Sequence, residues 1–555
     1  MTNSQLITQP ATPTGTSASE QRIAHSWCPT TVTVVNPLPQ ASTRATQHLV
    51  AAADHLAARA GDAIFAAGGN AVDAAIATNA AIAVTGPHLC GMGGDLFALV
   101  YTSDGVVALN SSGRAGSGAD AAALRDAGHT AMPLRHEIAA VTVPGCVDGW
   151  VALHERFGSL PLSTLLAPAI DLADRGFPAS PLLVGAASRV DARGREHLHE
   201  LVSQATHVGA NVRRPGVADA LRAIADGGRD AFYLGAFGDG LRALGRGLFD
   251  VDDLRRVAAD WVRPLSTDAF GVQLHTIGPN SQGYLTLGGA MVADHVDLGD
   301  PDTDRWAHVL IEAAKVAGHD RPAVLHEHAD GDALLEMIRS RAHLLDLDRC
   351  STWSAPGLAG DTTYLCTAEV GGMAVSLIQS NASGFGSWIV EPSTGINLHD
   401  RGLGFSLEPG HPAELGPGRR PPHTLSPAVA TRDGDLVSVF GTMGGDAQPQ
   451  ILLQIAARLF AGGASPAAAI NAPRWALAGP TTGFDTWDDP TVQHLEIEGH
   501  APDAWDAALA ARGHRVSRLP AFDSTFGHAH AIIADGDGLA GAADPRARIG
   551  AVIGR

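Results

Sequence analysis

The chain has 555 residues, of which 45% are hydrophobic and 17% are charged, so it can bury a large core. Its formal net charge of −20 argues against a nucleic-acid or anionic-membrane partner, because either would select a basic surface. The five cysteines are scattered and contain no C-x-x-C pair, which argues against a disulfide framework or a zinc site and favours reduced thiols.

Residues 1–40 are rich in Ser, Thr, Pro and Gln, a composition typical of a disordered terminus. They show no basic region followed by an apolar region, so no signal peptide is visible and a cytoplasmic location is expected. No uninterrupted apolar run reaches the roughly 18 residues of a membrane span.

The next segment is rich in alanine. From Ser42 its pattern predicts two helices with a break at Gly68-Gly69-Asn70, and the second helix is apolar on nearly all sides, so we expect it to be buried. A glycine-rich loop then leads into two strands joined by the Ser103-Asp104-Gly105 turn. Residues 160–350 alternate helical patterns with Gly and Pro breaks.

From Thr362 onward the pattern favours strands. β-rich runs flank Gly371-Gly372, and a second hairpin pattern surrounds Asp433-Gly434. A helical pattern begins at Gln448, and a last hairpin pattern begins near His528. Hairpins with helices before and after them predict a layered α+β sandwich.

Several short motifs could carry chemistry. His528 and His530 form one histidine pair, and His326-Glu327-His328 forms another cluster, but neither has the remaining ligands at a recognisable metal-site spacing. The strings GMGGD at 91–95 and MGGD at 443–446 could hold an anion with backbone N–H groups, or could simply be tight turns.

The string GDTTYLC at 360–366 raises a sharper possibility. A threonine hydroxyl is a weak nucleophile unless a base lies beside it. Cleavage before Thr362 would give that residue a free α-amine with a pKa of about 7.7–8.0, close to the ideal for a general base. Taken by itself, however, the string fits an ordinary start of a strand better than a cleavage site.

Seven sequence blocks together resemble the γ-glutamyltransferase family of N-terminal-nucleophile hydrolases. They occur in the family's order between about residues 45 and 550: GGNAVDAAIATNAAIAVTGPHLCGMGGDLFALVY, GRA, GDTTYLCTAEVGGMAVSLIQSNASGFGSWIVEPSTGINL, RRPPHTLSPA, FGTMGGDAQPQ, NAPRW and ADPR. The resemblance implies a four-layer αββα sandwich and self-cleavage between Asp361 and Thr362. The portions 41–361 and 362–555 would remain together as a heterodimer that forms one composite domain and acts on a small-molecule amide. No metal ion or organic cofactor is expected.

The resemblance also implies roles for individual residues. Thr362 would be the processing and catalytic nucleophile, steadied by Ser380, where the family usually has threonine. Gly444 and Gly445 would donate backbone N–H groups to the oxyanion. Arg114 would hold the substrate carboxylate, with His423 and Thr424 at the positions of a Ser-Ser pair that contacts the same group.

The sequence departs from the family where typical members hold the substrate α-ammonium with Asn, Gln and Asp. The corresponding residues here are Ala382, Arg401 and Gly404. Arg401 would repel an ammonium and attract a second carboxylate, unless it points away from the site.

Three functions are compatible with these observations. The first is hydrolysis or transfer of γ-glutamyl groups from glutathione-like amides. The second is an amidase for carboxylate-bearing acyl groups without the α-amine, such as glutaryl amides or oxamate. The third is an unprocessed homologue without enzymatic activity.

Overall fold

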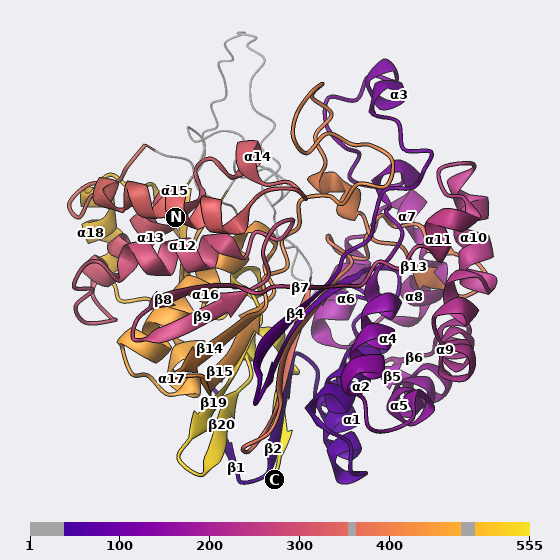
Figure 1. Ribbon diagram of the computed structural model, residues 1–555, viewed down its shortest axis with the longest axis horizontal. Coiled ribbons are helices and arrows are strands. Elements are labelled where there is room, and N and C mark those ends of the chain that lie inside the picture. Colours follow the sequence, from indigo (N-terminus) through magenta and orange to yellow (C-terminus); the bar gives the residue numbers. More distant parts are fainter. Residues whose placement is uncertain (1–37, 353–361, 479–493) are drawn as a thin grey trace, which may run out of the picture. The chain divides into compact units, whose positions relative to one another are not determined.

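Two antiparallel sheets form the centre of the computed structural model, which describes residues 38–352, 362–478 and 494–555 (Figure 1). Asp361 and most of the segment 1–40 lie outside these residues, so the expectations placed on them are not addressed by the structure. In the described part of the chain, each of the two sheets has seven strands.

Each sheet mixes strands from distant parts of the sequence. The order in the first sheet is β1 (Thr43–Ala45), β20 (Gly538–Ala542), β19 (Ala529–Asp535), β15 (Asp435–Thr442), β14 (Ala428–Arg432), β9 (Val272–Thr276) and β8 (Leu265–Ala269). The order in the second sheet is β21 (Ala551–Gly554), β2 (His48–Ala52), β10 (Thr363–Glu369), β11 (Ala374–Ser380), β3 (Asp95–Thr102), β4 (Gly105–Ser111) and β7 (Asp260–Val262).

The two sheets pack face to face through an apolar layer that includes Leu49, Phe97, Tyr364, Val439 and Ile532, all almost fully buried. Each outer face is covered by helices (Figure 1). The second sheet carries α1 (His55–Ala66), α2 (Ala71–Thr85), α4 (Cys146–Phe157), α5 (Leu162–Arg175) and α9 (Pro215–Tyr233). The first carries α12 (Tyr284–Ala293), α13 (Asp304–Gly318), α15 (Gly331–Arg341), α16 (Gln448–Ala456), α17 (Pro466–Asn471) and α18 (Ala504–Ala511). This arrangement confirms the predicted αββα sandwich.

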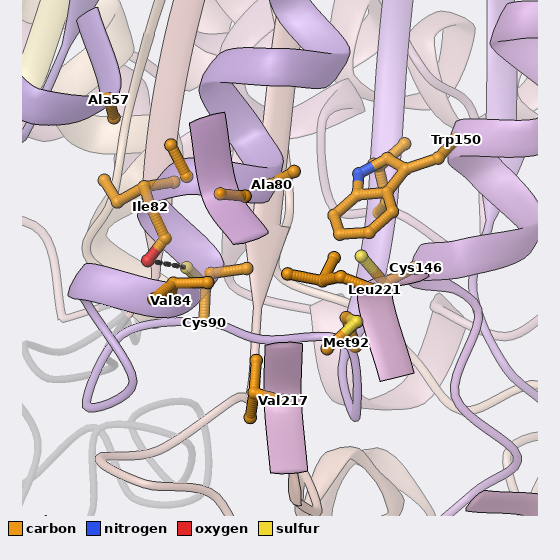
Figure 2. Close-up of a cluster of buried hydrophobic side chains, with 14 of the residues drawn as sticks. Ala57, Ala80, Ile82, Val84, Cys90, Met92, Cys146, Trp150, Val217 and Leu221 are labelled. Atoms are coloured by element: carbon orange, nitrogen blue, oxygen red, sulfur yellow. Dashed lines mark hydrogen bonds between the residues drawn. The ribbon is translucent and has the colours of Figure 1, made fainter. Parts of the chain in front are cut away.

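Helix α2 is buried along its whole length, as its all-round apolar sequence predicts. Its start is fixed by a capping box, in which Asn70 accepts hydrogen bonds from the N–H groups of Val72 and Asp73. Figure 2 shows Ala80, Ile82 and Val84 of α2 packed among side chains of neighbouring segments, including Trp150 of α4.

The prediction of helix from Ser42 is wrong for its first residues, because Thr43–Ala45 and His48–Ala52 are strands. The alanines of β2 favour a helix locally, but β2 lies between β10 and β21 and all five of its residues are buried. Sheet pairing therefore overrides the local preference. The hairpin of β8 and β9 was likewise hidden inside a region whose pattern is mainly helical.

Shorter elements complete the described structure. The remaining helices are α3 (Ala121–Asp126), α6 (Pro181–Ser188), α7 (Ala192–His197), α8 (His199–Gln204), α10 (Ala236–Gly245), α11 (Val251–Arg255) and α14 (Arg321–Val324). The remaining strands are β5 (Phe177–Pro178), β6 (Asn211–Val212), β12 (Val390–Glu391), β13 (Ile396–Asn397), β16 (Trp475–Ala478), β17 (His494–Glu498) and β18 (Val516–Leu519). Among the described helices, none has the length and apolarity needed to cross a bilayer.

Candidate active site

Thr362, Ser380 and Asp95 lie in a row at one end of the second sheet. Thr362 directly precedes β10, and the first residue of β10, Thr363, pairs with Gln379 of β11. The next residue of β11, Ser380, ends that strand and pairs with Asp95 at the start of β3. The hydroxyl oxygens of Thr362 and Ser380 are 2.9 Å apart, and both side chains are almost fully buried. The register of three neighbouring strands therefore brings these side chains together.

Arg401 enters the same cluster from a 3₁₀ turn, Arg401–Gly404. Its Nη2 donates to Ser380 Oγ at 3.4 Å and its Nη1 donates to Thr424 Oγ1 at 3.2 Å. Burial lowers the pKa of this guanidinium to about 10, and nearby Asp95, Asp400 and Asp446 oppose the shift. The group is thus a buried positive charge at neutral pH, connected to the Thr362 hydroxyl by two hydrogen bonds through Ser380.

The Gly444-Gly445 turn lies between β15 and α16. Both glycines have positive φ angles, 143° and 54°, a conformation that side chains disfavour. Gln282 Nε2 connects this turn to the cluster, because it donates to the carbonyl oxygens of Gly445 at 3.0 Å and of Thr424 at 3.2 Å. A continuous chain of hydrogen bonds therefore runs from Thr362 through Ser380, Arg401 and Thr424 to the glycine turn.

His423 contacts Asp95, whereas Arg401 donates to the hydroxyl groups of Ser380 and Thr424. Its Nε2 lies 3.2 Å from Asp95 Oδ2, while Asp95 Oδ1 accepts from the N–H groups of Gly113 at 2.9 Å and Gly145 at 3.1 Å. Burial, followed by the charge of Arg401, lowers the pKa of His423 to about 3, so this imidazole is neutral at physiological pH. Burial acts to raise the pKa of Asp95, but the nearby His399 together with hydrogen bonds from His423 and the Gly113 N–H lowers it to about 2.

Arg114 lies in an ionic cluster of its own. Its Nη1 is 3.2 Å from Glu327 Oε2 and its Nη2 is 3.6 Å from Asp260 Oδ2. Arg419 also reaches Glu327, with Nε 3.2 Å from Oε1. The structure thus connects Thr362, Ser380, Arg401 and Thr424 by successive hydrogen bonds, whereas it pairs Arg114 with acidic side chains. Arg114 follows Gly113 in the chain, one of the two residues whose N–H groups donate to Asp95.

Ala382 and Gly404, the two small residues that the sequence analysis aligned with ammonium ligands of the family, have clear structural settings. Ala382 has a φ of 72°, and its N–H donates to Ser380 Oγ at 2.8 Å. Gly404 lies so close to Pro422 that a Cβ atom would be 2.3 Å from the Pro422 carbonyl oxygen. An acidic side chain at position 404 would therefore require the chain at 422 to move.

The side chains of the two histidine motifs contact residues other than Thr362, Ser380, Arg401 and Thr424. Ser524 Oγ lies 2.7 Å from His528 Nε2, and the N–H of Asp544 donates to His530 Nδ1 at 3.2 Å. Glu327 of the other motif contacts arginines. Within the described residues, neither motif contributes to a group of three potential metal ligands.

Two residues of the cluster escaped the sequence analysis. Asp95 ends the GMGGD string, which predicted only an anion cradle or a turn, although its carboxylate accepts backbone N–H groups as a cradled anion would. Gln282 carried no sequence signal, because its role depends on a contact with segments more than 140 residues away.

Comparisons with known proteins agree with one another. The family model for gamma-glutamyltranspeptidase matches residues 57–554. An oxamate amidohydrolase proenzyme of Klebsiella pneumoniae is 36% identical over 531 residues, covering 92% of this chain and 98% of that protein. A glutathione hydrolase-like proenzyme of Bacillus subtilis is 34% identical over 535 residues, with the same coverage of 92% and 98%.

A solved structure shares the fold over nearly its whole length. The crystal structure of a cephalosporin acylase from Bacillus halodurans superposes with a TM-score of 0.85 at 33% identity, covering 95% of this chain and 99% of that one. The αββα sandwich is thus of the N-terminal-nucleophile hydrolase type. A match of the family model from residue 57 to residue 554 shows that the chain belongs to the gamma-glutamyltranspeptidase family.

Proposed function

We propose that this protein is a self-processing amidohydrolase whose substrates carry a carboxylate on the acyl group but no α-amine. The observation that carries the proposal is the guanidinium of Arg401, which donates to Ser380 and Thr424 beside Thr362. A buried cation at this point attracts an anionic acyl group and repels an ammonium. Gly404 supports the same conclusion, because Pro422 fills the space that an acidic ligand for the ammonium would need.

The neighbouring acidic groups already have partners. Asp95 accepts from two backbone N–H groups and faces His423, Asp400 Oδ2 is 2.7 Å from Arg135 Nη1, and Asp446 Oδ1 is 3.0 Å from Arg321 Nη2. An incoming ammonium would have to compete with these partners. A substrate carboxylate instead meets a guanidinium, a group that forms charge-assisted hydrogen bonds with anions.

The proposed mechanism uses Thr362 as both nucleophile and base. After cleavage of the peptide bond between Asp361 and Thr362, the α-amine of Thr362 takes the proton of its own hydroxyl. The hydroxyl oxygen then attacks the carbonyl carbon of the substrate amide. Arg401 disfavours protonation of that amine because both groups would be positive. The N–H groups of Gly444 and Gly445 hold the oxyanion, an interaction of the kind worth about 2.7–4 kcal/mol. As the C–N bond of the amide breaks, the amine leaves with the proton that the α-amine took up, and the acyl group stays on the Thr362 oxygen as an ester. Water then attacks this ester, passes a proton back to the Thr362 oxygen and releases the acyl group as a carboxylic acid.

Ser380 would steady the nucleophile. Its oxygen accepts from the N–H of Ala382 and from Arg401 Nη2, so the hydroxyl of Ser380 is oriented to donate its proton to Thr362 Oγ1. The Thr362 proton can then move to the α-amine. His423 would support the site from within by its contact with Asp95, and Arg114 would lie beside it in its cluster with Glu327 and Asp260.

The deciding experiment compares initial rates on glutaryl-p-nitroanilide and γ-glutamyl-p-nitroanilide, which differ only in the α-amino group. We expect the glutaryl substrate to be cleaved at least about tenfold faster, a difference of about 1.4 kcal/mol. A preference for γ-glutamyl would overturn the proposal and favour the second candidate, a glutathione-type hydrolase or transferase, which the similarity to a glutathione hydrolase-like proenzyme supports.

Processing is tested separately by intact mass. We expect two chains, 1–361 and 362–555, from the native sequence and one unbroken chain from Thr362→Ala. A native protein that stays in one piece, with no activity on either anilide, would instead support a non-enzymatic homologue.

A further inference from the structure

The only lysine in the chain, Lys315, lies in a buried polar cluster that shares no residue with the site above. It is on α13, and its Nζ donates to Glu312 Oε1 at 2.9 Å, Cys350 Sγ at 3.0 Å and the Ser351 carbonyl oxygen at 3.3 Å. The three acceptors match the three N–H bonds of an ammonium. Glu312 Oε2 in turn accepts from the N–H of Ser351 at 3.0 Å.

A lysine differs chemically from an arginine at this position. The chain has 38 lysines and arginines, of which a single one is lysine, so arginine serves as the cation everywhere else. A guanidinium is planar and spreads its donors over a fork, so it cannot direct three donors from one nitrogen. Nor is a guanidinium a useful nucleophile, whereas a lysine amine is one once it loses a proton.

Cys350 differs from the other described cysteines in its exposure. Cys90, Cys146 and Cys366 are buried, whereas Cys350 is only partly buried. Burial also raises the pKa of the three buried thiols, which makes them inert. Among the described thiols, Cys350 is therefore the one that a small oxidant can reach most readily.

We propose that Lys315 and Cys350 form a reversible covalent cross-link when a peroxide oxidises the protein. The peroxide first converts the Cys350 thiol to a sulfenic acid and leaves as water or an alcohol. The Lys315 ammonium transfers one proton to the Glu312 carboxylate, and its nitrogen attacks the sulfenic sulfur. A water molecule leaves with the sulfenic oxygen, its hydrogen and a second proton from nitrogen, so that an S–N bond remains. External thiols reverse the reaction by attacking the sulfur.

The nearby histidines do not turn this cluster into a metal site. Potential ligand atoms of His308, Glu312 and His514 lie within 4.8 Å of one another. The Lys315 ammonium is already 2.9 Å from Glu312, however, and a metal cation would have to share that carboxylate with it. The pair of opposite charges is complete without a metal, and the amine remains adjacent to the thiol.

The test uses the native protein treated with dilute hydrogen peroxide, denatured, blocked at free thiols, digested and analysed by mass spectrometry. We expect the peptides that contain Lys315 and Cys350 to appear as one linked species lighter by about 2 Da than their sum, and to separate on treatment with dithiothreitol. Because the chain has one lysine, the position of the link is unambiguous.

Three controls make the result specific to the folded geometry. Cys350→Ser removes the thiol, Lys315→Arg keeps the charge without the amine, and peroxide added after unfolding in urea removes the proximity. None should give the linked species. The proposal is overturned if the native protein yields only linear peptides, with Cys350 unmodified, oxidised to an acid or joined to another cysteine; this comparison does not depend on whether either variant folds.

Discussion

Arg401 is the residue whose substitution best separates substrate binding from chemistry. Arg401→Gln keeps a polar side chain of similar length but removes the charge that a substrate carboxylate would meet. We expect KM for glutaryl-p-nitroanilide to rise roughly 10–100-fold with a smaller change in kcat, because a charge-assisted hydrogen bond contributes about 1.5–3 kcal/mol. Steady-state kinetics on the processed variant measure both quantities.

Arg458→Gln is the matched control for this experiment. Arg458 is also buried, but it donates to the Pro301 carbonyl oxygen near α13, outside the cluster around Thr362. Its substitution should leave KM unchanged. If Arg401→Gln also leaves KM unchanged while lowering kcat, Arg401 acts on the nucleophile and does not bind the substrate.

At this scale the sequence was informative where a motif is contiguous. Thr362 and the two glycines of MGGD could be singled out as candidates because each lies within a short string that resembles the family. Gln282 could not, because a lone glutamine in a turn acquires a role only when Thr424 and Gly445 fold against it. The close contact of Gly404 with the Pro422 carbonyl oxygen could not be predicted from the sequence either, because it depends on how the chain folds.

Strand β15 offers a prediction about how the two sheets meet. A Cβ atom at Gly441 would lie 2.1 Å from Cε2 of Tyr364, whose fully buried ring on β10 is held by a 2.9 Å hydrogen bond to Ser376. Gly441→Ala should therefore destabilise the uncleaved Thr362→Ala precursor by about 1–3 kcal/mol, as overpacking does elsewhere. Urea unfolding monitored by circular dichroism gives the value.

Gly185→Ala provides the comparison for Gly441→Ala. Gly185 lies inside α6, where the nearest atom to an added Cβ, Arg189 Nη1, is 3.7 Å away. Alanine there should be neutral or stabilise the protein by about 0.5–1 kcal/mol, because glycine weakens helix interiors. Equal behaviour of the two variants would show that the sheets can separate enough to admit a methyl group at Gly441.

Elements were predictable when local pattern and final environment agreed. The β10–β11 and β14–β15 hairpins surround Gly371-Gly372 and Asp433-Gly434 as their sequences predict. Strand β2 was missed because its alanines prefer a helix, and only its two partner strands make an extended conformation favourable. The sequence of β2 does not show that it pairs with β21, which lies at the other end of the chain.

For the whole molecule, buried neutral histidines should make stability depend on pH. Burial lowers the pKa of His88, His423 and His528 to about 3, whereas an unfolded histidine titrates near 6.5. Between these values the unfolded state binds more protons, so stability rises with pH and is lost as the pH falls below about 6.5. Each such histidine contributes a slope of up to about 1.4 kcal/mol per pH unit.

The slope can be measured from urea midpoints of the Thr362→Ala precursor between about pH 7.5 and pH 5.5. His528→Asn should reduce the slope of the free energy of unfolding against pH by the contribution of one bound proton, since one buried imidazole is lost. His343→Asn, at an exposed position, should leave the slope as it was. Identical slopes in all three proteins would mean that His528 is not held neutral in the folded state.

The interleaving of strands also predicts how the two portions behave after processing. In the second sheet, β2 of the first portion lies between β21 and β10 of the second portion, and β3 pairs with β11. In the first sheet, β1 pairs with β20 and β9 pairs with β14. Separating residues up to 361 from residues 362–555 would therefore break strand pairs in both sheets and expose the apolar layer between them.

We accordingly expect the two processed chains to elute together from a size-exclusion column at the volume of the uncleaved Thr362→Ala precursor, and to separate only in denaturant. A substitution at one strand pair tests whether the sheets hold the two chains together. Ala51 of β2 and Cys366 of β10 are paired residues inside the apolar layer. Ala51→Asp should bury an unpaired charge there and lower the recovery of the paired chains. A small chain that elutes alone from the native processed protein would show that the sheets do not hold the portions together.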